Sequence, residues 1–197
     1  MPAGTLQEVF LFPLHTVLFP GGTLPLKVFE QRYIELTKIC LRDNRPFGVC
    51  LIKEGREVGA PATPHATGCL ATIIRWDMPQ LGVFQLVAQG TQRFAIVRSA
   101  AGNNGLISAT VELLPEEIPS APRDEVCVQV LKAIVERVGA ERFPAPPRFD
   151  EAGWVGYRLA EALPLSAIVK QQLLEMSDAH ARLALLHKLI ARQGLLG

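Results

Sequence analysis

The sequence predicts an α+β protein in which a barrel of about six short strands, with one helix inserted early, precedes a bundle of about four short helices. Over residues 8–114, short apolar segments alternate with turns rich in glycine, proline and asparagine, which is typical of a closed or nearly closed β-barrel. Residues 115–122 form a proline-rich linker, and from residue 124 the apolar residues recur with helical spacing. We therefore expect two subdomains, residues 1–118 and residues 119–197.

The first apolar stretch, residues 11–33, organises the first subdomain. It is interrupted by Pro13, Pro20 and Pro25. A proline fixes φ and donates no backbone N–H, so it is rarely found inside a central strand. The stretch therefore divides into short elements: a strand at 10–14, a loop through 20–22, an extended segment at 24–26 and a helix that begins at Glu30.

Helical spacing runs through residues 28–43. One side of this helix is apolar and carries Val28, Phe29, Tyr33, Leu36, Ile39 and Cys40. The charged residues fall elsewhere and are expected to face solvent; they are Glu30, Arg32, Glu35, Lys38 and Arg42. The helix should end before Pro46, because the residue preceding a proline avoids the α region.

The remaining strands of the barrel are short and β-rich. They are predicted at residues 47–53, 68–76, 83–89, 93–98 and 107–113. Prolines make residues 56–67 a loop, and residues 77–82 and 101–105 are turns, since Asn and Gly tolerate positive φ. Gly90 is expected to break the strand that residues 93–98 then continue. The last strand alternates apolar and polar residues most clearly.

Four helices are predicted after the linker. The first starts at Asp124 and is broken at residues 143–147, and the others run from about Glu151 to Ala162, from Ala167 to Glu175, and from about Ser177 onward. The first has an apolar face formed by Val126, Cys127, Val130, Leu131, Ile134, Val135 and Val138. Ser166 is a plausible N-cap of the third helix, and either Ser177 or Asp178 caps the last one.

The composition excludes several classes of protein. Lys and Arg number 20 and Asp and Glu 19, so the chain lacks the basic excess of a dedicated nucleic-acid binder. We expect no signal peptide and no membrane span, because no apolar run reaches roughly 18 residues. The four cysteines form no C-x-x-C pair, and we expect reduced core thiols in a cytoplasmic protein. A disulfide between Cys50 and Cys69 is the alternative.

No group of residues predicts catalysis, a metal or a cofactor. His15 has no acidic neighbour in sequence, and His180 and His187 lie two helical turns apart, farther than a helical metal pair such as H-E-x-x-H. Ser177, Asp178 and His180 are adjacent, but the members of a catalytic triad converge from distant segments. We interpret Ser177 and Asp178 as caps and the histidines as surface residues, and we expect the protein not to be an enzyme.

Four further residues leave two interpretations open. Arg93 follows a glycine turn at the head of a strand, where it either anchors carbonyl or carboxylate groups inside the fold or binds a ligand. Trp76, Phe84 and Phe94 lie on strands, where they either belong to the core or line a groove.

Motifs in four places resemble the N-terminal domain of the Lon protease family. The opening resembles that family through Leu11-Phe12-Pro13-Leu14, Val17-Leu18-Phe19-Pro20 and Leu24-Pro25-Leu26. Residues 68–73 are similar to its "G-T-x-A-x-I" strand, and residues 90–94 to its "G-x-x-R-F" turn. The end resembles the family through Leu163-Pro164-Leu165, residues 172–178 and Arg182-Leu183. Together, and in this order, the motifs cover nearly the whole chain.

The resemblance implies a six-stranded pseudo-barrel related to PUA domains, followed by a helical bundle. It also implies a non-catalytic module that engages unfolded or extended polypeptide segments and can self-associate as a homodimer. The chain has no G-x-x-x-x-G-K-[ST] phosphate loop, so we do not expect it to act alone as an ATP-dependent protease. RNA binding is the alternative function, since PUA-like barrels bind RNA elsewhere, although the charge balance disfavours nucleic acid.

The resemblance also indicates where a polypeptide would bind. Lon proteins have charged residues at the start of the early helix, near a surface used for substrate contact. The matching positions here are Glu30, Gln31 and Arg32, with Gln31 in place of the usual acidic residue. Phe19 and Pro20, from the apolar stretch, complete the candidate polypeptide-binding site.

Overall fold

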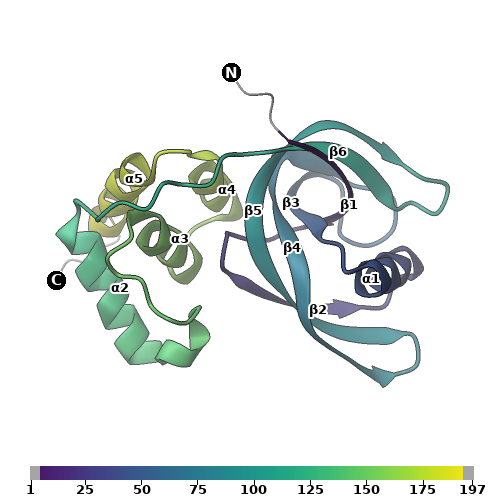
Figure 1. The fold of residues 1–197 in the computed structure, drawn as a ribbon, viewed down its shortest axis with the longest axis horizontal. Helices are drawn as coiled ribbons and strands as arrows, with labels where there is room; N and C mark the ends of the chain where they lie inside the picture. Colours follow the sequence, from purple (N-terminus) through teal and green to yellow (C-terminus); the bar gives the residue numbers. More distant parts are fainter. Residues whose placement is uncertain (1–4, 193–197) are drawn as a thin grey trace. The chain divides into compact units, whose positions relative to one another are not determined.

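The computed structural model describes residues 5–192. The chain divides into two compact units, and the boundary in the sequence falls between Glu116 and Glu117. Figure 1 shows the strands and one helix in the first unit and the remaining helices in the second. The first unit contains β1 (Leu6–Leu14), β2 (Thr23–Val28), α1 (Gln31–Asp43), β3 (Phe47–Glu54), β4 (Thr63–Gln80), β5 (Val83–Ala101) and β6 (Ile107–Leu113). The second contains α2 (Glu125–Val138), the 3₁₀ turn η1 (Ala140–Arg142), α3 (Ala152–Ala162), α4 (Ala167–Glu175) and α5 (Ala179–Arg192).

The six strands form one sheet in the order β2-β5-β4-β3-β1-β6, and a further pairing joins β6 to β5. Five strands therefore form a closed circuit of pairings, while β2 pairs with β5 alone. Strands β1 and β3 run parallel, and the other pairs are antiparallel. The predicted α+β class with six strands and one inserted helix is confirmed, with β2 attached to the side of the circuit.

The predicted break at Gly90 is wrong, because β5 runs without interruption through this residue. A Cβ atom at Gly90 would lie 2.3 Å from the carbonyl oxygen of Phe19. Gly90 also exchanges two backbone hydrogen bonds of 2.8 Å with the loop, accepting from Gly21 and donating to Gly22. Gly90 thus allows the chain around residue 20 to approach β5 closely, which is a common reason for glycine inside a strand.

Several predicted boundaries also differ from the structure. Val28 and Phe29 precede the early helix, because Val28 completes the pairing of β2 with β5 and α1 begins at Gln31. Strand β4 begins at Thr63 within the predicted loop, and the hairpin turn shrinks to Leu81 and Gly82, since Gln80 already pairs with Val83. The two long strands β4 and β5 therefore form one extended hairpin (Figure 1).

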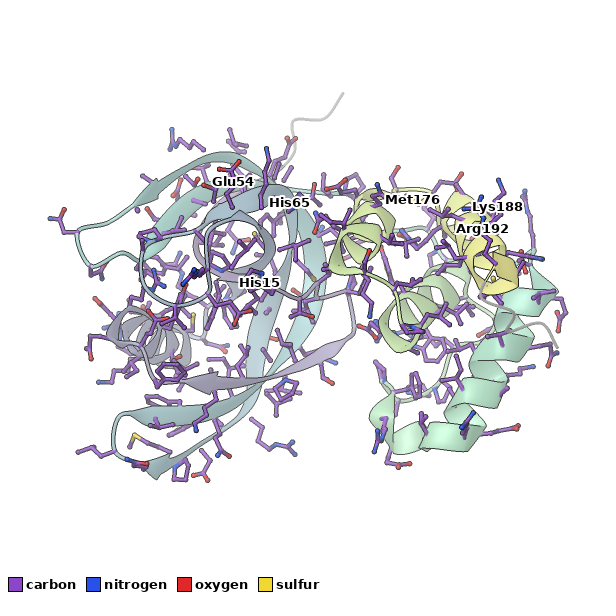
Figure 2. All side chains as sticks on the ribbon, turned by 180° about the vertical axis from the view of Figure 1, so that it is seen from behind. His15, Glu54, His65, Met176, Lys188 and Arg192 are labelled. Carbon is purple, nitrogen blue, oxygen red and sulfur yellow. The ribbon has the colours of Figure 1, made fainter. Side chains whose placement is uncertain are left out.

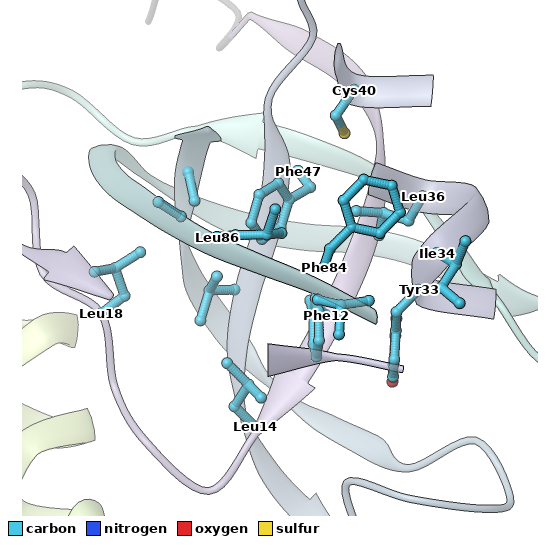
Figure 3. Close-up of a cluster of buried hydrophobic side chains, with 14 of the residues drawn as sticks. Phe12, Leu14, Leu18, Tyr33, Ile34, Leu36, Cys40, Phe47, Phe84 and Leu86 are labelled. Carbon is cyan, nitrogen blue, oxygen red and sulfur yellow. The ribbon is translucent and has the colours of Figure 1, made fainter. Parts of the chain in front are cut away.

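The core of the first unit lies between α1 and the strands. Figure 3 shows Phe12, Tyr33, Phe47, Phe84 and Leu86 gathered there, and the rings of Phe12 and Tyr33 stack with centroids 3.9 Å apart. Each such side chain contributes about 1.5–3 kcal/mol on full burial.

The residues whose interpretation was left open fall mostly inside this unit. Phe84 belongs to the cluster around α1, and Phe94 packs in a second cluster with Leu11. Arg93 is only 4% exposed. Trp76 is 51% exposed and contacts the core through the ring of Phe84, 5.9 Å away between centroids.

Two helices of the second unit, α4 and α5, begin at predicted caps, and Asp124, predicted only as the start of a helix, caps α2. Asp124 accepts a hydrogen bond from the backbone N–H of Cys127 at 3.0 Å, and Ser166 accepts one from Val169 at 3.4 Å. Asp178 caps α5 by accepting from the N–H groups of His180 and Ala181. No helix in the described part of the chain is long and apolar enough to cross a membrane.

A buried arginine joins several segments of the second unit. Arg182 on α5 is fully buried and forms an ion pair with Glu117. It also donates to the carbonyl oxygens of Leu173 and Met176, and its guanidinium lies 4.1 Å from the ring centroid of Tyr157. Arg182 therefore connects α3, the end of α4 and α5 to the segment that leads into the unit.

The Asp124→Asn substitution is expected to reduce the pH dependence of stability in acid. Burial alone would raise the pKa of Asp124, but hydrogen bonds from Cys127 and His187 outweigh it and lower this pKa. In the unfolded chain the pKa of Asp124 is about 4, and above this pH the ionised carboxylate stabilises the fold. The contribution is lost as the pH falls through the lower pKa that Asp124 has in the folded protein.

Urea unfolding followed at several pH values between about 6 and 3 checks this prediction. The difference in free energy of unfolding between the parent and the Asp124→Asn variant should shrink below about pH 4. Glu125→Gln is the control, because it replaces a neighbouring exposed carboxylate. A difference that stays constant with pH would contradict the assignment.

Candidate functional site

A groove in the first unit lies beside β2. Its volume is about 300 Å³, at the lower end of the range for ligand sites. It is lined by the end of β1, most of β2, the start of α1 and one loop; the residues are Phe12, Leu14, Thr16, Leu24–Val28, Phe29, Glu30, Tyr33, Glu57 and Val58. Core side chains thus reach one part of the groove, while Phe29 and Val58 are more than half exposed at its rim.

Strand β2 gives this groove an unusual wall. Strands β2 and β6 lie at the two ends of the sheet order, but β6 also pairs with β5. Among the strands in the described residues, β2 alone therefore pairs along one side only. The pairing of β1 with β6 stops at Leu11, so the groove-lining residues Phe12 and Leu14 lie beyond it. The groove is therefore lined by an unpaired strand edge as well as by side chains.

Arg32 is bonded to two residues that line the groove, Glu30 and Glu57. It was predicted to face solvent, but it is only 5% exposed. Its guanidinium lies 3.1 Å from a carboxylate oxygen of Glu30, and it donates to the backbone oxygen of Glu57 at 3.1 Å. A further hydrogen bond of 3.4 Å reaches the carbonyl of Gly105. Arg32 therefore holds together the start of α1 and two loops.

Two charges remain at the mouth of the groove. The Glu57 carboxylate accepts a 2.6 Å hydrogen bond from the backbone N–H of His15, and it has no ion-pair partner among residues 5–192. Lys27 is exposed on β2. The Tyr33 phenol stays neutral, because burial raises its pKa and Glu30 adds to this effect, while Arg32 opposes it.

The residues predicted as the polypeptide-binding site lie in different places. Glu30 lines the groove, whereas the buried Arg32 and the exposed Gln31 are not part of its lining. Phe19 has no exposed surface, and its backbone lies close to Gly90. Pro20 follows it in the chain and is partly buried. Neither residue lines the groove. We therefore leave Phe19 and Pro20 out of the site.

Among the residues that line the groove, only Glu30 was in the predicted binding site. Glu57 and Val58 lie in a loop whose composition carries no functional signal. Phe29 was assigned to a helix face, and Lys27 fell between the predicted extended segment and the helix. The one sequence feature that indicated a free edge here was Pro25 in β2, because proline is tolerated on edge strands.

A second hollow lies on the other side of the β2-β5-β4 arm. Its volume is about 420 Å³, and Pro25, Lys27, Arg75, Asp77 and Val87 are among its lining residues. Its charged lining residues are Lys27, Arg75 and Asp77. We regard the groove beside β2 as the candidate site, because more of its lining belongs to the buried core cluster.

A serine–histidine contact in the second unit does not form a catalytic triad. The Oγ atom of Ser120 lies 3.3 Å from Nε2 of His180. The other ring nitrogen of His180 is buried and has no hydrogen-bond partner in the part of the chain that the structure describes. Asp178, which was the acidic member of the sequence pattern, accepts backbone hydrogen bonds as a helix cap instead. A triad requires an acid on that nitrogen to orient the base.

The remaining histidines and the cysteines are the residues that could bind a metal. His15 and His65 both lie in the first unit (Figure 2). Within residues 5–192 there is no group of three or more potential metal ligands. All four cysteines are buried free thiols, so the alternative disulfide between Cys50 and Cys69 is not present. Burial raises the pKa of Cys40 to about 11 and that of Cys127 to about 12.

Comparison with known proteins identifies the family. Residues 8–192 match the family described as the ATP-dependent protease La (LON) substrate-binding domain, and the chain belongs to this family. A crystal structure of a Lon N-terminal domain protein from Xanthomonas campestris is 37% identical and superposes with a TM-score of 0.78, covering 92% of this chain and 98% of that one.

Full-length relatives extend far beyond the matched region. The Lon protease of Paraburkholderia phytofirmans is 27% identical over 188 residues, which are 90% of this chain and 23% of that protein. The N-terminal domain of a Mycobacterium avium complex Lon protease shares the fold at 21% identity, with a TM-score of 0.59 over 91% of this chain and 96% of that one. These matches agree with the predicted resemblance and give no support to the RNA-binding alternative.

Proposed function

We propose that this protein binds extended segments of unfolded polypeptides in the groove beside β2 and that it does so without catalysis. The observation that supports this most directly is the groove itself, which combines core side chains, an unpaired strand edge and two exposed apolar residues, Phe29 and Val58. Membership of a substrate-binding family supports the same function.

The shape of the groove favours a segment of chain over a small compact ligand. It is open along β2 and shallow, so a bound polypeptide would bury only a few side chains. Affinity per segment is then modest, and a Kd of tens of micromolar corresponds to about 6–7 kcal/mol. A folded protein keeps most of its apolar side chains and strand backbone internal and offers less to this surface than an unfolded chain does.

The double substitution Phe29→Ser and Val58→Ser is expected to weaken the binding of an unfolded polypeptide about tenfold. Both side chains lie at the rim and are more than half exposed, so their loss removes apolar contact with the ligand at little cost to folding. The measurement is fluorescence anisotropy with a labelled, reduced and alkylated protein that cannot fold, compared with the same protein in its native state.

Leu81→Ser is the matched control. Leu81 is 89% exposed at the turn of the β4–β5 hairpin, outside the groove. If the rim variant and the control bind equally well, the groove is not the site. If the parent protein binds no unfolded polypeptide, the proposed function itself is wrong.

Three further properties belong to this proposal. We infer that the protein has no hydrolytic activity, a proposal that measurable ester or peptide hydrolysis abolished by Ser120→Ala would overturn. Four free buried thiols support a reducing compartment such as the cytoplasm. Self-association into a homodimer stays a prediction, which sedimentation equilibrium tests.

A further inference from the structure

The backbone of β2 is arranged to receive another strand. In an antiparallel pair, the N–H and C=O groups of one residue point to the same side, and successive residues alternate between the two sides. Pro25 lies opposite Val87 and has no N–H, so Pro25 belongs to the set that points away from β5. Leu24, Leu26 and Val28 then bond β5, whereas Thr23, Pro25 and Lys27 point toward the free edge.

These outward groups have no other use in the structure. No hydrogen bond from outside the sheet reaches the backbone of Thr23 or Lys27 among residues 5–192. The N–H of Lys27 and the carbonyl oxygens of Pro25 and Lys27 lie on the stretch of β2 that lines the groove. An incoming strand would find one donor there, the N–H of Lys27, and two acceptors, the carbonyl oxygens of Pro25 and Lys27. Pro25 supplies no donor, because proline has no N–H.

The side chains around this edge select the chemistry of the incoming strand. Phe12, Leu14 and Tyr33 provide apolar contact on the core side of the groove. The Glu57 carboxylate at the mouth lacks an ion-pair partner within the described residues, while Glu30 is already paired with Arg32. A segment with aliphatic side chains toward the core side and a Lys or Arg beside Glu57 complements both features, while Lys27 repels a basic residue placed directly opposite it.

We propose that the bound polypeptide adds to the free edge of β2 as a further strand, with aliphatic residues toward the core side and a basic residue beside Glu57. This inference rests on the proposed function and specifies its mode and its ligand. Main-chain hydrogen bonds supply the affinity in this mode, and the alternate side chains supply the preference.

Backbone N-methylation of the ligand tests strand addition directly. The probe is a short labelled peptide that alternates valine and lysine, made in three forms: unmodified, N-methylated on every valine, and N-methylated on every lysine. A strand donates to β2 from every second residue only, so one methylated form should lose binding about tenfold or more and the other should keep it. Equal binding of all three forms would overturn strand addition.

Variants of β2 give a second, independent readout. Pro25→Ala restores a donor at the free edge and should tighten binding of the unmodified peptide about threefold. Lys27→Pro removes the outward donor without touching the ladder to β5, and it should weaken binding more than Lys27→Gln, which keeps the N–H. No gain from Pro25→Ala, together with equal losses from the two Lys27 variants, would overturn the proposed register.

The charge preference has its own control. Glu57→Gln keeps an acceptor for the N–H of His15 but removes the charge, and it should weaken the valine–lysine peptide about three- to fivefold in low salt. Glu54→Gln removes an exposed carboxylate at the end of β3, outside the groove lining, and should have no effect (Figure 2). A valine–glutamate peptide that binds as tightly would overturn the basic preference.

These outcomes separate the two proposals. If the unfolded protein binds and the rim variant weakens it, while N-methylation has no effect, the groove binds polypeptide by side-chain contact alone. The proposed function then stands and strand addition fails.

Discussion

Replacing Arg182 with alanine is expected to lower the free energy of unfolding of the helical unit by about 3–5 kcal/mol. Arg182 is fully buried, and the substitution leaves the Glu117 carboxylate, itself only 12% exposed, without its cation. The carbonyl oxygens of Leu173 and Met176 lose a donor as well. Since a domain is stable by only about 5–15 kcal/mol, the variant should be partly unfolded in mild denaturant.

The two tryptophans allow this effect to be measured in one unit at a time. Trp154 lies on α3 and Trp76 on β4, and the chain has no other tryptophan. In a Trp76→Phe background, the fluorescence during urea unfolding reports on the helical unit. Arg148→Ala is the matched control, because Arg148 is 55% exposed in its ion pair with Glu151, and its loss should cost about 0–1 kcal/mol. Equal losses from both variants would show that burial of Arg182 contributes nothing.

Replacing Gly90 with alanine is expected to destabilise the first unit by about 3 kcal/mol or more. The new Cβ atom would lie 2.3 Å from the carbonyl oxygen of Phe19 and 3.1 Å from Cγ of Leu18. The first of these is a backbone atom, which cannot rotate away as a side chain can. Relief requires that the loop move off β5, which breaks the two hydrogen bonds that Gly90 makes with Gly21 and Gly22.

Urea unfolding in a Trp154→Phe background, where Trp76 is the only fluorophore, measures this loss in the first unit. Gly102→Ala is the control, because the nearest atom to its new Cβ is Oδ1 of the Asn104 side chain at 3.2 Å, and it should change stability by about 0.5 kcal/mol or less. A Gly90→Ala variant as stable as this control would mean that the close approach at Phe19 is easily relieved.

Local patterns in the sequence were sufficient to predict most elements. The alternation over residues 107–113 predicted β6, and the predicted caps Ser166 and Asp178 begin α4 and α5. Such features depend on neighbours a few residues away, which a sequence displays directly.

The errors concern contacts between distant segments. Arg32 was placed on a solvent-exposed face because it falls among charged residues, but its backbone acceptors lie 25 and 73 residues away, at Glu57 and Gly105. Gly90 was interpreted as a strand break because its neighbour Phe19 comes from another part of the chain. The groove depends on the same long-range contacts, which is why only Glu30 among its lining residues was selected in advance.

The closed circuit of strands also sets an order in time. Leu6 of β1 pairs with Glu112 of β6, so the first strand of this unit to be synthesised receives its last partner only after nearly all of the unit has been made. At about 5–20 residues per second, this interval is on the order of ten seconds. During this interval the apolar residues of β1, among them Leu11 and Phe12, lack some of the side chains that bury them in the folded unit. A protein whose proposed task is to bind unfolded chains thus begins as a nascent chain that itself needs shielding.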